Sequence, residues 1–349
     1  MSYVTITITA DKVESDLTDF LLLINLEDMP TEFWSGVASD GSDCFITDTS
    51  DTLVNYFLVD FDSVNSTGYI YTKVSLSSTV DNVFRVQYGS AVSDQQNTAA
   101  TLSNYVAYFV SKADGNLYEL ITGTSWTDGS TTTVISENMG LHPQTGYPFV
   151  NGRRIESTSS AVYLSNAIAV NTNFTLAVTA KPSVLGSRNR SLIQYLSSWG
   201  ATPSRYGIVI LNTTGYPIVS WNPADNDLVS SSHNTIAGAV VRTHLTTQSG
   251  VQRILYTQGV QSGIDTTVAA TLTGLDTVGL AAEDASLNET FSGNLAHAYI
   301  RSEELSASFI AAEYSNMTDP SVFIGIVGSE PPLSGNARRV INITYSYEE

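Results

Sequence analysis

Alternation of apolar with polar residues is the feature that most constrains this chain. In the first such segment, Val4, Ile6 and Ile8 alternate with threonines. Because successive side chains of a β-strand point to opposite faces, this period of two predicts strands with one buried face. Turns rich in Asp, Asn, Ser and Gly separate the segments, which favours antiparallel sandwiches. Further strands are predicted at 20–26, 54–61, 69–76, 83–88, 174–180, 191–196, 206–212, 239–246, 251–257 and 294–301.

The length of 349 residues suffices for about two domains, each with its own core. We therefore predict an all-β fold of two antiparallel, jelly-roll-like β-sandwich domains. Their predicted bounds are 1–100 and 101–327, and residues 328–349 form a linker and a terminal strand. One short helix near the carboxyl terminus is expected at 307–315, because Ser306 can cap its first turn.

The terminal segment 339–347 alternates again, beyond a short linker that contains two prolines. A final strand in this position has two interpretations. It pairs back onto the body of its own chain, or it adds to the sheet edge of a neighbouring subunit. We expect the protein to be a homo-oligomer.

The charge balance limits the class of partner. The formal net charge is −19 and the sequence pI is near 4.4, so the chain repels phosphate backbones and nucleic-acid binding is not expected. The single cysteine, Cys44, cannot form an intrachain disulfide and is expected in the core. No stretch approaches the roughly 18 apolar residues that span a bilayer. The first residues have the pattern of a strand, so no signal peptide is expected.

Three passages of the second half carry a resemblance to a known family: 173–182, 251–260 and 291–300. In order, they are similar to a first core strand, a strand ending in a turn, and the closing strand of the concanavalin A-like lectin/glucanase (laminin-G-like) domain family. The turn departs from the family's Tyr-x-Asn-Gly, because Gln258 replaces the asparagine. The resemblance implies a jelly-roll sandwich that binds carbohydrate or a surface, and it assigns no active site.

The first half resembles a bacterial domain of unknown function that often precedes such lectin-like domains in surface and pilus-associated proteins. The residues that carry this are the segment 16–20, Phe33-Trp34, the segments 39–43 and 86–89, and a carboxy-terminal stretch at 312–323.

Residue patterns for catalysis are weak. A retaining glycosidase needs two carboxylates about 5 Å apart, and the glucanase pattern Glu-x-Asp-x-x-Glu is absent from the sequence. Glu283 and Asp284 are adjacent, so on a strand they would point to opposite faces. The four histidines, His142, His233, His244 and His297, lie far apart, and no Gly-x-Ser-x-Gly motif accompanies them. We therefore predict that the protein is not an enzyme.

One turn combines an aromatic side chain with polar ones, which is what sugar recognition requires. The predicted glycan-binding residues are Trp221, Asn222, Asp225, Asn226 and Asp227. No cofactor is expected and the metal content is unknown, but Ca²⁺, which prefers oxygen ligands, is the metal that this turn could hold. The alternative is an ordinary turn, because Asn-Pro and Asp-Asn-Asp are common turn sequences.

An extracellular type of domain without a signal peptide favours a bacteriophage virion, because virion proteins assemble in the cytoplasm and leave by lysis. We expect a non-enzymatic structural protein, a capsid decoration or a tail or fibre component, whose lectin-like domain binds host-surface glycans or decorates the shell. Its expected partners are other virion proteins and host glycans. The alternatives are a bacterial surface adhesin or pilus-associated subunit, and a glycan-degrading enzyme of the glucanase class.

Overall fold

A computed structural model gives the fold. It describes residues 2–89, 93–112, 117–121, 127–128, 135–138, 151–155, 162–164, 173–182, 190–196, 205–210, 217–222, 228–229, 241–248, 252–266, 277–280, 291 and 293–330.

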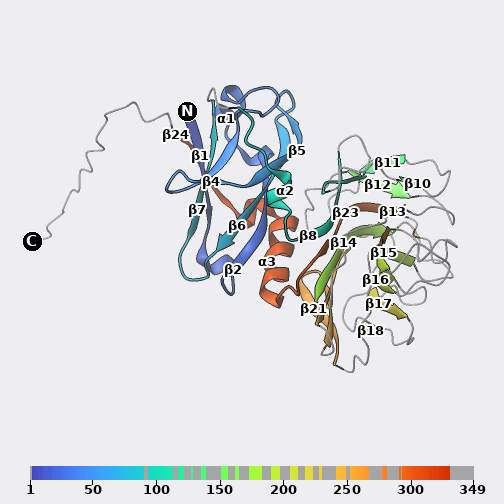
Figure 1. Ribbon diagram of the computed structural model, residues 1–349. Helices are drawn as coiled ribbons and strands as arrows, with labels where there is room; N and C mark the ends of the chain where they lie inside the picture. Colours follow the sequence, from blue (N-terminus) through green and yellow to red (C-terminus); the bar gives the residue numbers. More distant parts are fainter. Residues whose placement is uncertain are drawn as a thin grey trace, which may run out of the picture.

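The first unit stacks a five-stranded sheet on a three-stranded one (Figure 1). In β1 the predicted alternation holds, since Val4, Ile6 and Ile8 are fully buried. Cys44 is buried in the same core, as predicted. The five-stranded sheet has the order β24 (Gly325–Glu330), β1 (Ser2–Ile8), β7 (Asn82–Tyr88), β3 (Phe45–Asp48) and β4 (Leu53–Val54). The three-stranded sheet has the order β2 (Leu17–Asn25), β6 (Thr67–Leu76) and β5 (Tyr56–Asp62).

The second unit is a larger sandwich, and every strand pairing that the structure describes is antiparallel. One sheet has the order β10 (Thr127–Asp128), β13 (Val162–Leu164), β22 (Thr277–Leu280), β15 (Arg190–Leu196), β16 (Arg205–Ile210), β17 (Pro217–Asn222) and β18 (Leu228–Val229). The other has the order β11 (Ile135–Asn138), β12 (Asn151–Ile155), β23 (Gly293–Arg301), β14 (Phe174–Pro182), β19 (Val241–Gln248), β20 (Gln252–Thr257) and β21 (Val260–Asp265). Beside it, β8 (Tyr105–Ser111) pairs with β23 and with β9 (Leu117–Glu119).

The all-β sandwich class is thus confirmed. The predicted helix is α3 (Ala307–Thr318), whose Ser306 accepts a hydrogen bond from the backbone N–H of Phe309. The sequence patterns missed three helices of four to six residues, which are too short to show a helical period. These are α1 (Thr31–Gly36), α2 (Thr98–Thr101) and α4 (Pro320–Phe323). Two 3₁₀ turns lie at Ala10–Lys12 and Leu26–Asp28.

The chain returns to the first unit after it has built the second. α3 packs on β2, and β24 pairs with β1 along Ile6↔Ile326 and Thr5↔Val327. The predicted division at residues 100 and 327 stays a prediction, but β24 spans the second boundary and belongs to the sheet of β1. No helix in the described ranges is long and apolar enough to cross a membrane.

The two units share one hydrophobic core at their junction, where α3 lies between them (Figure 1). Tyr108 of β8 stands at its centre, with its ring centroid 6.0 Å from Tyr71 and 6.5 Å from Phe57 of the first unit. Tyr299 of β23 and Phe309 of α3 belong to the same core. The opposite face of the sheet formed by β14, β19 and β23 is buried in the sandwich interior. One sheet of the second unit therefore carries a core on each face.

Candidate functional site

A buried ion pair joins the two units. The Nη2 atom of Arg242, on β19, lies 2.9 Å from Oε2 of Glu313, on α3, and their side chains are 0% and 5% exposed. Glu313 follows Phe309 by one helical turn, so it lies on the face of α3 that is buried. The helix therefore carries a carboxylate into a junction that is otherwise mainly apolar and aromatic.

Two histidines complete this cluster. His244 Nε2 lies 2.5 Å from Glu313 Oε2, and His297 Nδ1 lies 2.8 Å from Arg242 Nη1. The carboxylate accepts, so Nε2 of His244 carries a hydrogen; the guanidinium only donates, so Nδ1 of His297 accepts. Tyr299 also donates its hydroxyl hydrogen to Glu313 Oε2, at 3.1 Å. Two hydrogen-bond donors and the guanidinium charge of Arg242 thus converge on one carboxylate oxygen.

Burial and the ion pair decide the protonation states. Burial alone would raise the pKa of Glu313, but the charge of Arg242 and the hydrogen bond from His244 outweigh it and hold this pKa well below its ordinary value. Burial lowers the pKa of His244, and burial together with the charge of Arg242 lowers that of His297. At neutral pH the cluster therefore contains a paired Arg⁺ and Glu⁻ and two neutral imidazoles.

A β-bulge directs His297 into this cluster. In the pairing of β23 with β14, Thr179 is opposite His297 and Ala180 is opposite Leu295, so Ala296 is an extra residue. Leu295 consequently packs inside the sandwich, while His297 faces the junction. Without the bulge, the period of two would put both side chains on the same face.

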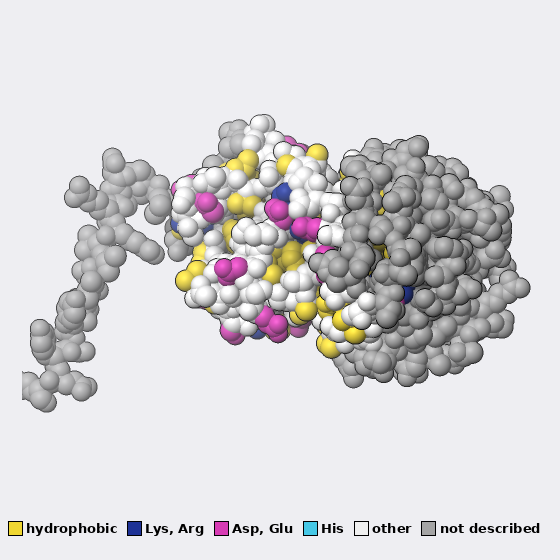
Figure 2. All heavy atoms as spheres, turned by 60° about the horizontal axis from the view of Figure 1, so that its bottom comes forward, with side chains coloured by type: hydrophobic (Ala, Val, Ile, Leu, Met, Phe, Trp, Pro, Cys, Tyr) yellow, Lys and Arg dark blue, Asp and Glu magenta, His cyan; other side chains and the backbone are white. Residues whose placement is uncertain are grey.

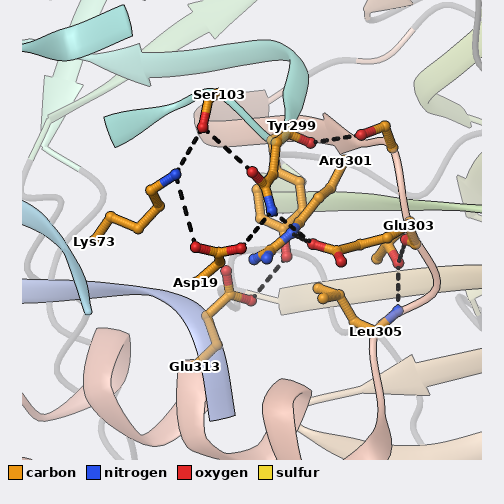
Figure 3. Close-up of polar contacts among 11 residues, drawn as sticks. Asp19, Lys73, Ser103, Tyr299, Arg301, Glu303, Leu305 and Glu313 are labelled. Atoms are coloured by element: carbon orange, nitrogen blue, oxygen red, sulfur yellow. Dashed lines mark hydrogen bonds and ion pairs between the residues drawn. The ribbon is translucent and has the colours of Figure 1, made fainter. Parts of the chain in front are cut away.

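A second set of polar contacts extends from this cluster to the surface (Figure 3). The guanidinium of Arg301 lies between the rings of Tyr105 and Phe309, 5.3 and 4.7 Å from their centroids, and its Nε donates to Glu303. Burial opposes the charge of Arg301, but Tyr105 and Glu303 raise its pKa above the ordinary value.

Asn104 carries the contacts across to the first unit. Its amide donates to Glu303 Oε1 at 3.3 Å and to Asp19 Oδ2 at 3.0 Å. Asp19 has a positive φ of 51° and lies at a register shift in β2. Its other carboxylate oxygen lies 3.7 Å from Nζ of Lys73, which also donates to Ser103 at 2.6 Å. The junction is thus polar at its rim and ionic at its centre.

This arrangement suits docking better than proton transfer. The groups that could exchange protons, Glu313, His244 and His297, are at most 5% exposed and contact one another or Arg242. Removing one partner of a buried ion pair leaves an uncompensated charge, at a cost of about 3–5 kcal/mol. Loss of any one member would therefore weaken the contact between the two units.

The members of this cluster are remote in the chain, so local sequence patterns do not predict it. The histidines lie far apart in the sequence, but the fold brings His244 to Glu313 and His297 to Arg242, the two members of one ion pair. One signal was present: Arg242 and His244 alternate on one face of a strand. That alternation indicates a polar face on the strand. It does not identify Glu313, the partner of Arg242, which lies on a helix some 70 residues later.

The structure does not test the predicted glycan site. Trp221 and Asn222 end β17, where they pair with Tyr206 and Arg205 of β16. Asp225, Asn226 and Asp227 lie outside the described residues, as do His142 and His233. Among the residues that the structure describes, no group of three His, Cys, Asp or Glu side chains could hold a metal ion. Calcium binding at 221–227 therefore stays a prediction.

The chain is similar to known proteins only at the level of solved structures, and only distantly. Neither a family model nor a curated protein matches this chain. Among solved structures, the botulinum neurotoxin serotype G binding domain is 11% identical with a TM-score of 0.44, over 60% of this chain and 50% of that one. The chain thus spans about half the length of that domain.

Two further structures were solved with oligosaccharides. Domain 4 of AbnA, an extracellular arabinanase from Geobacillus stearothermophilus, in complex with arabinotriose, is 12% identical with a TM-score of 0.45, covering 60% of this chain and 98% of that one. The CBM40 of the Ruminococcus gnavus IT-sialidase, bound to α2,3 sialyllactose, is 16% identical with a TM-score of 0.35, covering 41% and 83%. At these identities and scores, the likeness carries no argument about function.

Proposed function

We propose that this chain is a non-enzymatic structural protein of a virion, which holds a lectin-like β-sandwich rigidly on a smaller β-unit and displays it for glycan binding at the host surface. The observation that carries the proposal is the Arg242–Glu313 pair with its two histidines. It commits the buried acid–base groups to docking, so that the second unit is presented in one orientation.

Rigid display follows from the way in which the units are connected. Three links would have to break for the units to separate: the common core around Tyr108, the buried ion pair, and the return of α3 and β24 to the first unit. Opening would expose aromatic surface, and it would also strip the buried charges of their partners. Because the second unit is held in this way, the orientation of the first unit determines the orientation of the lectin-like sandwich.

The surface supports display outside a cell and does not favour nucleic-acid binding. Only 14% of the residues are charged, and the net charge is −19. On the face that Figure 2 shows, white uncharged polar groups and backbone predominate among the described residues, with hydrophobic patches, scattered acidic groups and few basic ones. Short neutral hydroxyl and amide groups can hydrogen-bond sugar hydroxyls without a large desolvation cost.

A glycan array with the fluorescently labelled full chain tests the binding function. We expect binding to a restricted set of glycans, and its loss in Asp225→Ala/Asp227→Ala. Asp40→Ala, at an exposed turn of the first unit, is the matched control and should bind as the parent does. Addition of EDTA shows whether calcium takes part. Binding that survives the double substitution would remove the predicted site, and an empty array would remove the glycan-binding function.

Two further measurements separate the alternatives. A reducing-sugar assay on laminarin, agar and host polysaccharide detects the glucanase, and any enzyme-dependent release of sugar would overturn the non-enzymatic proposal. Mass spectrometry of purified virions and the identity of the flanking genes test whether the protein belongs to a virion. We expect peptides of this chain in the virions, and capsid or tail genes beside its gene. A neighbourhood of pilus genes would favour the bacterial adhesin instead.

A further inference from the structure

The five-stranded sheet of the first unit ends at β24. Of the strands that the structure describes, β24 pairs with β1 alone, so the other edge of its backbone faces outward. Five of its six residues are uncharged, and its only charge is at the last position, Glu330. Natural edge strands are usually protected by charge, proline or a covering element. Gly325–Val327 contains neither a charged residue nor a proline.

The core beneath this edge is incompletely covered. Ile326 pairs with Ile6 and lies on the same, inward face, yet Ile6 is fully buried while Ile326 is only half-buried. On the outward face, the side chain of Val327 is 59% exposed. One more strand would cover Ile326 and satisfy the outward backbone groups of β24.

The chain itself contains a segment suited to this edge. Residues 331–349 follow β24, and within them Ile341, Ile343 and Tyr345 alternate with Asn342 and Thr344. This is the pattern of β1, in which Val4, Ile6 and Ile8 alternate with threonine and face the core. A strand with one apolar face is what an open edge above a half-covered core requires.

The linker favours a neighbouring molecule over the same one. Pro331 and Pro332 follow β24 directly, and consecutive prolines keep the backbone extended and remove two N–H donors. Two prolines at this point disfavour a tight hairpin that would return the chain to its own sheet edge. Arg338 and Arg339 lie at the start of the alternating segment and Glu348 and Glu349 follow its end, so residues 331–349 carry no net charge. The segment therefore meets no net repulsion from the first unit of another copy, although residues 1–100 hold fifteen acidic and three basic residues.

We propose that residues 339–347 of one copy pair with the open edge of β24 of a second copy, and that this strand addition makes the protein an oligomer. The proposal is independent of glycan binding, because it concerns the first unit and the tail.

Light scattering coupled to size-exclusion chromatography tests it on the full chain. Ile341→Lys/Ile343→Lys charges the apolar face of the segment, and Asn342→Lys/Thr344→Lys adds the same charge to its polar face as the matched control. We expect an oligomer for the parent and the control, and a monomer for the Ile341/Ile343 variant. Hydrogen exchange of amides 325–330 locates the contact, and it should become at least 10-fold faster in that variant.

Each other outcome overturns the proposal. An oligomer that persists in the Ile341/Ile343 variant is held by another surface. A monomeric parent with tail-dependent protection of residues 325–330 shows that the chain's own tail fills the edge. A monomeric parent with unprotected β24 shows that the edge stays open. Near-ultraviolet circular dichroism of all three proteins confirms that the two units remain folded.

Discussion

The side chain of Asn316, on α3, makes the two backbone hydrogen bonds to Leu23 of β2 that a neighbouring strand would otherwise make. Its side-chain oxygen accepts a hydrogen bond from the Leu23 N–H, and its amide donates to the Leu23 carbonyl, both at 2.8 Å. The two residues are 293 positions apart in the chain. On its other side, Leu23 pairs with Tyr71 of β6. The end of the sequence therefore completes the hydrogen bonding of a strand at its beginning.

Replacement of this side chain should be costly. In Asn316→Ala the buried N–H and C=O of Leu23 lose their partners, and each unsatisfied group costs about 1–3 kcal/mol. We expect the free energy of unfolding to fall by roughly 2–4 kcal/mol in urea titrations. Ser315→Ala, on the exposed side of the same helix, should change it by less than about 0.5 kcal/mol. Equal effects of the two substitutions would show that these hydrogen bonds contribute little.

Neutralising one member of the central ion pair should destabilise the junction. Glu313→Gln leaves the buried charge of Arg242 uncompensated, and we expect a loss of about 3–5 kcal/mol in the free energy of unfolding. Arg242→Met/Glu313→Met removes both charges and should recover most of that loss. Exposed Glu32→Gln is the charge control and should be near neutral. A double variant as unstable as Glu313→Gln would contradict the argument.

The two histidines predict a loss of stability in mild acid. Their pKa values lie below 6.5 in the folded protein, so below that pH the unfolded chain binds more protons and folding becomes less favourable. Two such groups give a slope of up to about 2.7 kcal/mol per pH unit. The pKa of Glu313 is lowered from 4.5, so its contribution is lost only at lower pH.

Urea unfolding at several pH values between 7.5 and 5 measures this slope. His297→Asn keeps an acceptor for Arg242 without an imidazole that titrates, and it should roughly halve the slope. A parent whose stability is constant from pH 7.5 to 5 would show that the imidazoles are not held neutral.

Gly207 should resist substitution because of its neighbour. It pairs directly with Gln194, and a Cβ at this position would lie 1.9 Å from Gln194 Oε1. Gln194 is fully buried and donates to Ser191 at 2.6 Å, so its amide cannot move aside easily. Gly207→Ala should lower the free energy of unfolding by about 1–3 kcal/mol. Gly328→Ala, where nothing lies within 4 Å of the new Cβ, is the control. Adding Gln194→Ala to the Gly207→Ala variant should restore part of the lost stability. If it does not, the close contact is not the cause of the loss.

Periodicity identified the strands because it records burial directly. The alternation at Val4, Ile6 and Ile8 and the cap at Ser306 were local signals, and each led to the correct element. A helix of four residues such as α2 has no period to detect. Sheet partners were also beyond local patterns, because β24 reaches β1 across nearly the whole chain.

The candidate site was less accessible to sequence reasoning than the fold. Glu313 has the same local surroundings as an exposed helical glutamate, and its role depends on Arg242 and His244 being brought to it by another unit. His297 enters the cluster through a bulge that no periodic rule contains. Local alternation is enough to define which face of a strand is apolar, because that depends on nearest neighbours along the chain. Which charges become buried together depends on how the layers dock, and that is settled by packing between residues far apart in the chain.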